Sequence, residues 1–257
     1  MINAGLYGLI GGAALFIGAL IGLYTQVSKR VVGVVMAFGS GVLISALTFD
    51  LMDKAYQIGG FDSVSIGFIV GAIIFVGGDY LIDSYGGHYR KLHHGVRHSA
   101  QPSAPPASKL AASGSAILLG ALLDGIPESA AIGVGLAAHH GIGLSMLIAV
   151  FLSNLPEGIS GAMGMKAAGH SKLYIIGVWS ATIAASGVAA ALGYQFLGNA
   201  SVDIIATTMA LAAGAILAMI ADTMIPEAFE ESGRFVALVT VAGFLLAFIV
   251  SHLTGLE

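Results

Sequence analysis

Two short segments of this sequence combine a proline with acidic and polar side chains that can bind a cation. They are Asp124-Gly125-Ile126-Pro127-Glu128 and Ser153-Asn154-Leu155-Pro156-Glu157. Asp124 and Glu128 are four residues apart, as are Ser153 and Glu157, so each pair would share one face of a helix. Together with Asn154, these residues supply three carboxylates, an amide and a hydroxyl. An oxygen-rich set of this kind suits hard divalent cations.

The prolines add a second feature to these segments, because each lacks an amide hydrogen and disturbs the carbonyl four residues earlier. Inside a bilayer a freed carbonyl must find a partner, or line a wet or ion-filled site. A single Pro-Glu pair would also fit a simple kink beside a protonated, hydrogen-bonded acid. Two matching pairs at similar depth favour a cation site instead. No Lys or Arg lies near either pair, so the acids must share protons or meet a cation.

The composition places these segments in a membrane. Of the 257 residues, 57% are hydrophobic and only 9% are charged, whereas soluble domains carry about a quarter charged residues. The net charge of -4 and the lack of a basic run argue against a nucleic-acid partner. The absence of Cys excludes disulfides and thiolate metal sites. The first apolar stretch has no cleavable-leader pattern and reads as a retained span.

The apolar segments predict an all-α fold, a single bundle of eight transmembrane helices surrounded by lipid. The expected spans are 4–24, 31–53, 61–83, 112–138, 142–167, 173–197, 202–226 and 235–254. Residues 84–111 form the only long connection, and their Pro, Ser and His content predicts a mobile loop. The many glycines indicate close helix packing.

The distribution of Lys and Arg predicts the orientation of these spans. Nine of the ten fall in the connections after the first, third, fifth and seventh spans, and only Lys54 lies on the other side. The positive-inside rule therefore places those four connections in the cytoplasm and both termini outside. The expected location is a plasma membrane, which the chain crosses several times.

Further ionisable residues are candidates for an ion path. Asp222 and Glu227 end the seventh span on the inner side, and Asp50 and Asp53 end the second span on the outer side. For Asp222 and Glu227, a plain helix boundary is an equally good interpretation. Four histidines in the 84–111 connection can capture metal weakly, or belong to an ordinary polar loop: His88, His93, His94 and His98.

With these residues the chain resembles the prokaryotic branch of the ZIP (Zrt/Irt-like protein) family of divalent-metal transporters. The resemblance covers nearly the whole chain and rests on eight spans, outside termini, a His-bearing third connection and paired Pro-Glu motifs. It implies a midplane metal site, directional transport of zinc or a similar divalent ion, and no cofactor. Glu128, Asn154 and Glu157 match the family pattern. Dimers are common among such proteins, and small-residue faces would permit a homodimer.

Four positions depart from the family pattern. Asp124 stands where the family has His, and Gly125 where it usually has Asn. Ser153 replaces the leading His or Gln of the second motif, and Ser186 replaces a frequent Glu. Exchanging imidazole for carboxylate and hydroxyl favours harder ions such as Mn²⁺ over Zn²⁺. The expected metal site is therefore Asp124, Glu128, Ser153, Asn154 and Glu157, holding one ion or a weakened pair.

The expected function is inward transport of a divalent cation by a secondary transporter, which is not an enzyme. Two alternatives remain open. The substituted ligands also suit a homologue that no longer transports metal or carries another cargo, and acts as a sensor or scaffold. Two buried carboxylates could also serve an intramembrane enzyme. The sequence lacks a His-Glu-x-x-His motif, and it lacks the second Asp motif that an intramembrane aspartyl enzyme would need. Both absences weigh against the enzyme.

Overall fold

The computed structural model describes residues 2–82, 107–137, 144–197 and 200–254. Within these ranges the side chains of residues 107–118, 124, 144–145 and 253–254 are not described. The described chain is helical almost throughout and contains no strand, so the expected all-α fold is confirmed.

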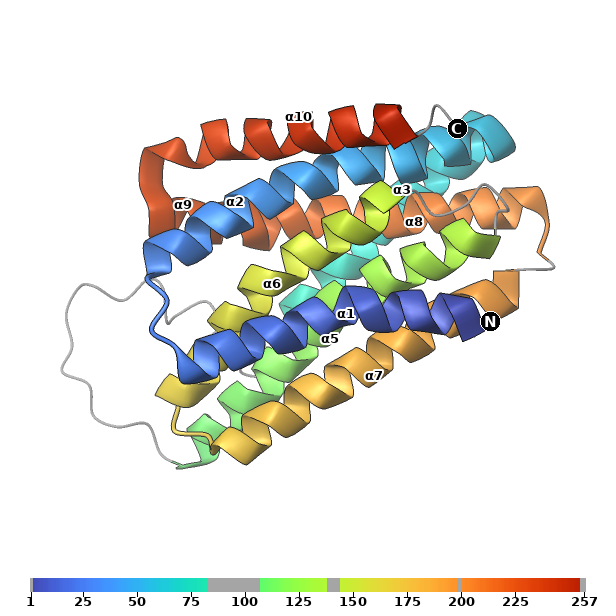
Figure 1. Cartoon of the computed structure of the whole chain (residues 1–257). Helices are drawn as coiled ribbons and strands as arrows, with labels where there is room; N and C mark the ends of the chain where they lie inside the picture. Colours follow the sequence, from blue (N-terminus) through green and yellow to red (C-terminus); the bar gives the residue numbers. More distant parts are fainter. Residues whose placement is uncertain (1, 83–106, 138–143, 198–199, 255–257) are drawn as a thin grey trace.

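The helices follow the apolar segments of the sequence (Figure 1). In chain order they are α1 (Ile2–Tyr24), α2 (Lys29–Ala46), η1 (Leu47–Asp53), α3 (Lys54–Ile82), α5 (Ala107–Ala137), α6 (Leu144–Ala167), α7 (Lys172–Leu197), α8 (Val202–Met219), η3 (Ile220–Met224), α9 (Ile225–Ser232), η4 (Gly233–Phe235) and α10 (Val236–Thr254). η1 and η3 are π-helical segments within the longer helices around them, and such segments are frequent at functional sites. α5 begins five residues before the expected span.

Six helical stretches of the described chain are long and apolar enough to cross a membrane. Two of them are 54 and 51 residues long, covering Lys29–Ile82 and Val202–His252. Each of the two contains one glycine with a positive φ, Gly60 at 70° and Gly233 at 69°, where the helical path breaks. The chain is therefore suited to a membrane, while the count of eight spans stays a prediction.

The helices form two groups that pack against each other (Figure 1). In the first group, α1 packs against α6 and α7, and α7 packs against α5. In the second group, α2 packs against α10, and α3 packs against α8. Large apolar side chains on the outer faces of α3 and α10 are exposed, as lipid-facing residues would be: Ile66, Ile73, Leu238 and Val241.

Two apolar cores divide the interior unevenly. The larger core joins α2, α3 and α8 to one half of α5 and α6, through residues such as Ile132 and Val150. The smaller core joins α1 and α7 to the other half, through residues such as Ala121, Ala162 and Met165. Pro127 lies between Ala121 and Ile132 in α5, and Pro156 lies between Val150 and Ala162 in α6. The two halves of each of these helices thus pack in different cores.

Glycines allow the close contact of α1 with α6 beside the second Pro-Glu motif. A Cβ atom on Gly158 would collide with the backbone carbonyl of Leu15, and one on Gly18 would collide with that of Leu155. Neither backbone can yield without moving a whole helix. In contrast, a Cβ atom on Gly125, beside the first motif, would find its nearest neighbour at 3.8 Å.

This difference predicts opposite outcomes for two matched substitutions. Gly158→Ala forces α1 away from α6 and should destabilise the protein by about 1–3 kcal/mol, the usual effect of overpacking. Gly125→Ala should leave stability unchanged or slightly raised, because it fits and favours helix. Thermal unfolding of the two variants in detergent checks this, and equal melting temperatures would contradict the close contact.

Candidate functional site

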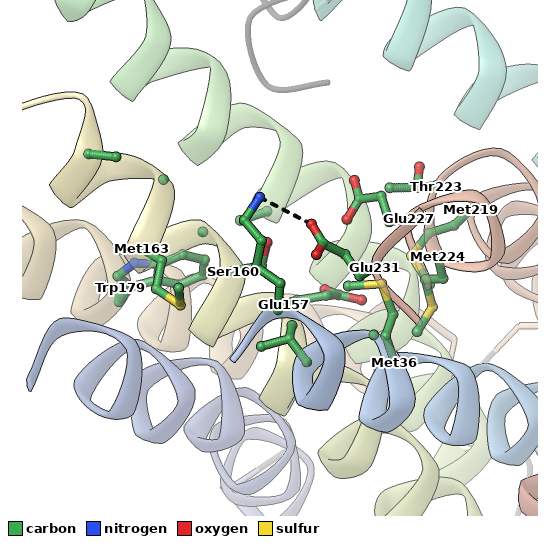
Figure 2. Close-up of a pocket in the computed structure, with 17 residues that line it drawn as sticks. Met36, Glu157, Ser160, Met163, Trp179, Met219, Thr223, Met224, Glu227 and Glu231 are labelled. Carbon is green, nitrogen blue, oxygen red and sulfur yellow. Dashed lines mark hydrogen bonds and ion pairs between the residues drawn. The ribbon is translucent and has the colours of Figure 1, made fainter. Parts of the chain in front are cut away.

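A cavity of about 240 Å³ opens between the two helix groups (Figure 2). α2, α8, η3 and α9 line one side, and α5, α6 and α7 line the other. Both apolar cores contribute to its wall, with Met36 and Met219 from the larger and Trp179 from the smaller. The cavity therefore follows the boundary along which the two groups meet.

Three glutamates line this cavity. Glu157 comes from the Pro-Glu motif of α6, and Glu227 and Glu231 come from α9 on the opposite side. Hydroxyl groups of Ser160 and Thr223 accompany them. Figure 2 shows these side chains around a common space. The cavity thus connects Glu157, a predicted ligand, to the two glutamates of α9.

The mouth of the cavity lies at the end of the bundle that carries most of the positive charge. Lys29 lines the cavity, and its side chain is 61% exposed. Lys166 lies at the same end, where its ammonium donates a hydrogen bond to the Leu23 carbonyl at 2.8 Å. At the opposite end of α5 and α6, Ile132 and Val150 are fully buried in the larger core. The two groups are therefore parted at one end and packed together at the other.

Glu128, the other motif glutamate, is buried beside α6 and not in the wall of the cavity. It is 1% exposed, and the hydroxyl of Ser153 donates to its Oε1 at 3.0 Å. The structure therefore brings together one residue from each motif, as their matching depth predicted. The same hydroxyl lies 3.0 Å from the Val150 carbonyl, so its single hydrogen is shared between two acceptors.

Asn154 connects the second motif to α1. Its amide nitrogen donates to the Gly11 carbonyl at 3.1 Å. Its Oδ1 is buried and has no hydrogen-bond partner within the described part of the chain. This arrangement fixes the amide so that its oxygen remains available as an acceptor or a metal ligand.

The remaining predicted ligands are only partly visible. Asp124 lies in α5 one turn before Glu128, but its side chain is outside the described residues. The four loop histidines, His88, His93, His94 and His98, are also outside the described residues. A Cβ atom on Gly125 would lie 3.8 Å from the hydroxyl of Ser186, so these two positions face each other between α5 and α7.

The four path acids fall in different places. Glu227 lines the cavity, whereas Asp222 is exposed on η3 and is not in the cavity wall. On η1, Asp50 is 8% exposed and pairs with Lys54 at 3.5 Å. Asp53 is exposed and accepts a hydrogen bond from Gln57 at 2.7 Å. Only Glu227 therefore joins Glu157 at one site.

Several residues of the cavity wall were not among the candidates predicted from the sequence, and Glu231 and Lys29 are two of them. Four methionines also line the cavity, and an apolar residue within a span carries no sequence signal for that role: Met36, Met163, Met219 and Met224. Their thioethers are soft, polarisable groups.

Among the described side chains, which exclude that of Asp124, no three His, Asp or Glu residues converge closely enough to hold one metal ion. Glu157, Glu227 and Glu231 line the same cavity, whereas Glu128 is buried outside its wall.

Comparison with known proteins assigns no family to the chain. A scan against models of protein families and a search of curated proteins both give no match.

The cavity predicts the reactivity of cysteines placed in a chain that has none. Ser160→Cys lies in the cavity wall and should react with a water-soluble thiol reagent applied from the Lys29 end. Ser45→Cys should stay unreactive, because Ser45 is 1% exposed and does not line the cavity. Labelling rates in oriented vesicles measure this, and faster labelling of Ser160→Cys from the opposite end would contradict the proposed mouth.

Proposed function

We propose that this protein transports a divalent metal cation across a membrane through the space between its two helix groups. The observation that carries the proposal is the cavity, which leads from the Lys29 end of the bundle to Glu157. Ionisable groups within a membrane bundle are costly and usually mark an ion or substrate path. Three glutamates in one such cavity are better explained by a cation than by packing.

The proposal includes eight membrane crossings. Gly60 and Gly233 break the two longest apolar stretches, so each of these stretches would cross twice. With this topology the positive-inside rule places the Lys29 end in the cytoplasm. The structure then corresponds to an inward-open conformation, from which the ion would leave toward the cytoplasm.

Transport would require the packed end to open as the cavity closes. Alternating access by movement of one helix group against another fits this need, because the candidate ligands lie at the boundary between the groups. Pro127 and Pro156 lie where α5 and α6 change from one core to the other, and a proline gives a helix a natural point of bending. The described chain supplies carboxylates that can accept protons when metal leaves, which would couple transport to protons.

The proposed ligands are Glu157 and Glu128, with Asn154, Ser153 and Asp124 completing the site. Oxygen ligands favour hard ions, but the four methionine thioethers of the cavity suit softer ones. We therefore propose a divalent transition-metal cargo of intermediate character, such as Mn²⁺ or Fe²⁺, with Zn²⁺ and Cd²⁺ as competitors. The ZIP-like arrangement inferred from the sequence agrees with this proposal.

The principal alternative is a sensor or scaffold that binds a cation without moving it. The buried hydrogen bond between Ser153 and Glu128 favours this alternative, because it holds one proposed ligand away from the cavity. Metal uptake distinguishes the two, since a sensor would bind the ion and transport nothing.

The transport proposal is tested by uptake into proteoliposomes that contain a fluorescent metal indicator. Glu157→Gln should lower uptake about tenfold or more, because it replaces a charged ligand in the cavity by a neutral one. Glu230→Gln should retain wild-type uptake, since Glu230 is exposed and does not line the cavity. Zn²⁺, Mn²⁺, Fe²⁺, Co²⁺, Cd²⁺ and Mg²⁺ are each tested. No uptake of any ion by folded wild-type protein would refute transport and leave the sensor.

The ion preference of the cavity is tested by a different substitution. Met219→Leu removes a thioether from the cavity and should lower the ratio of Cd²⁺ uptake to Mn²⁺ uptake about twofold. Met209→Leu is the matched control, because Met209 is equally buried in α8 but lies outside the cavity wall. An identical ratio in the two variants would show that the thioethers do not contact the ion.

A further inference from the structure

A positively charged side chain of the protein, that of Lys29, lies at the mouth of the cavity. The Lys29 ammonium lies 3.4 Å from Oε1 of Glu231, and both residues line the cavity. Figure 2 shows this contact as a dashed line that ends at Glu231. The two side chains come from α2 and α9, which are separated by 202 residues in the chain.

The helices around this pair are held firmly. The Ser28 hydroxyl accepts a hydrogen bond from the Val31 amide and caps α2 immediately before Lys29. The Ser232 hydroxyl donates to the Arg30 carbonyl at 2.9 Å, which ties α9 to α2. A Cβ atom on Gly33 would collide with the Ser232 hydroxyl, so the two backbones are close together. The Lys29–Glu231 contact is therefore not needed to join these helices.

The pair is also poorly suited to a purely stabilising role. The Lys29 side chain is 61% exposed, and ion pairs with an exposed partner contribute little to folding stability. The Glu231 side chain is only 13% exposed and faces the cavity from the end of α9. The arrangement thus presents a carboxylate to the cavity and pairs it with the ammonium of an exposed side chain.

A second polar group lies in the same part of the wall. Thr223 is 9% exposed, and its hydroxyl oxygen is buried without a hydrogen-bond partner in the described part of the chain. Thr223 and Glu227 are one helical turn apart at the junction of η3 and α9 and line the cavity together. The cavity wall therefore offers the oxygen atoms of Thr223 and Glu227 in addition to those of Glu157 and Glu231.

We propose that Lys29 is a release residue, whose ammonium competes with the transported cation for Glu231 at the cytoplasmic mouth. This inference rests on the proposed transport function. An ion that leaves Glu157 meets Glu227, Thr223 and Glu231, and these oxygens would retain it if Glu231 were fully available. The Lys29 ammonium then forms its ion pair with Glu231 again, which displaces the ion into the cytoplasm. The same positive charge opposes re-entry of cytoplasmic cations.

The test compares four variants in proteoliposomes with Mn²⁺ as the probe. Lys29→Gln should lower the maximal uptake rate, and internal Mn²⁺ should inhibit it at about fivefold lower concentration, since a positive charge a few ångströms away is removed. Lys29→Arg should behave as wild type. Lys29→Gln combined with Glu231→Gln should recover the rate, because the retaining carboxylate is then also gone. Arg30→Gln is the matched control, as it removes a neighbouring exposed charge outside the cavity wall.

The outcomes separate this inference from the function on which it rests. Absence of Mn²⁺ uptake by the wild type, with no uptake of the other ions, overturns both. Wild-type uptake with equal behaviour of Lys29→Gln and Arg30→Gln overturns the release role alone. A double variant as slow as Lys29→Gln, with unchanged inhibition by internal Mn²⁺, would show that the pair is only a structural contact and would also overturn the release role. Melting temperatures of all variants in detergent confirm that each protein is folded.

Discussion

A carboxylate inside a membrane bundle must be satisfied by the bundle, by water or by an ion, because lipid offers no hydrogen bonds. The structure meets this constraint in two ways. The hydroxyl of Ser153 donates to the buried Glu128, whereas Glu157 lines a cavity that reaches the surface. The two motif glutamates are alike in sequence but different in surroundings. One is held in a closed contact between helices, and the other lies in the wall of a cavity.

Glycine packing determines where the bundle can part. Gly18 and Gly158 bring the backbones of α1 and α6 into contact, so these helices behave as one unit. The half of α5 after Pro127 and the half of α6 before Pro156 share a core with α2 and α8, and Ala121, Ala162 and Met165 in the other halves share a core with α1 and part of α7. The cavity lies where both cores contribute to one wall, and the acids of α6 and α9 line it. A site between two rigid groups is what alternating access requires.

The chemistry of the cavity is broader than its acids alone suggest. In the proposed transporter, carboxylates would attract the cation, thioethers would soften the preference for hard ions, and the ammonium of Lys29 would weaken binding at the mouth. A transporter needs such a balance, because an ion that is bound too tightly is not released. In our proposal, Glu157 and Lys29 are the attractive and repulsive ends of one path, joined by Glu227 and Glu231.

The sequence alone determined the features that depend on local chemistry. The apolar runs predicted helices, and the Pro-Glu motifs predicted acids at matching depths, because helix length and proline effects follow from neighbouring residues. Only the tertiary structure decided which of these acids face a common space. It joined Glu128 to Ser153, gave Glu157 to the cavity, and brought Lys29 to Glu231 across 202 residues. It also placed four methionines in the wall of the cavity. Their position there depends on which helices meet, and no single apolar segment carries that information.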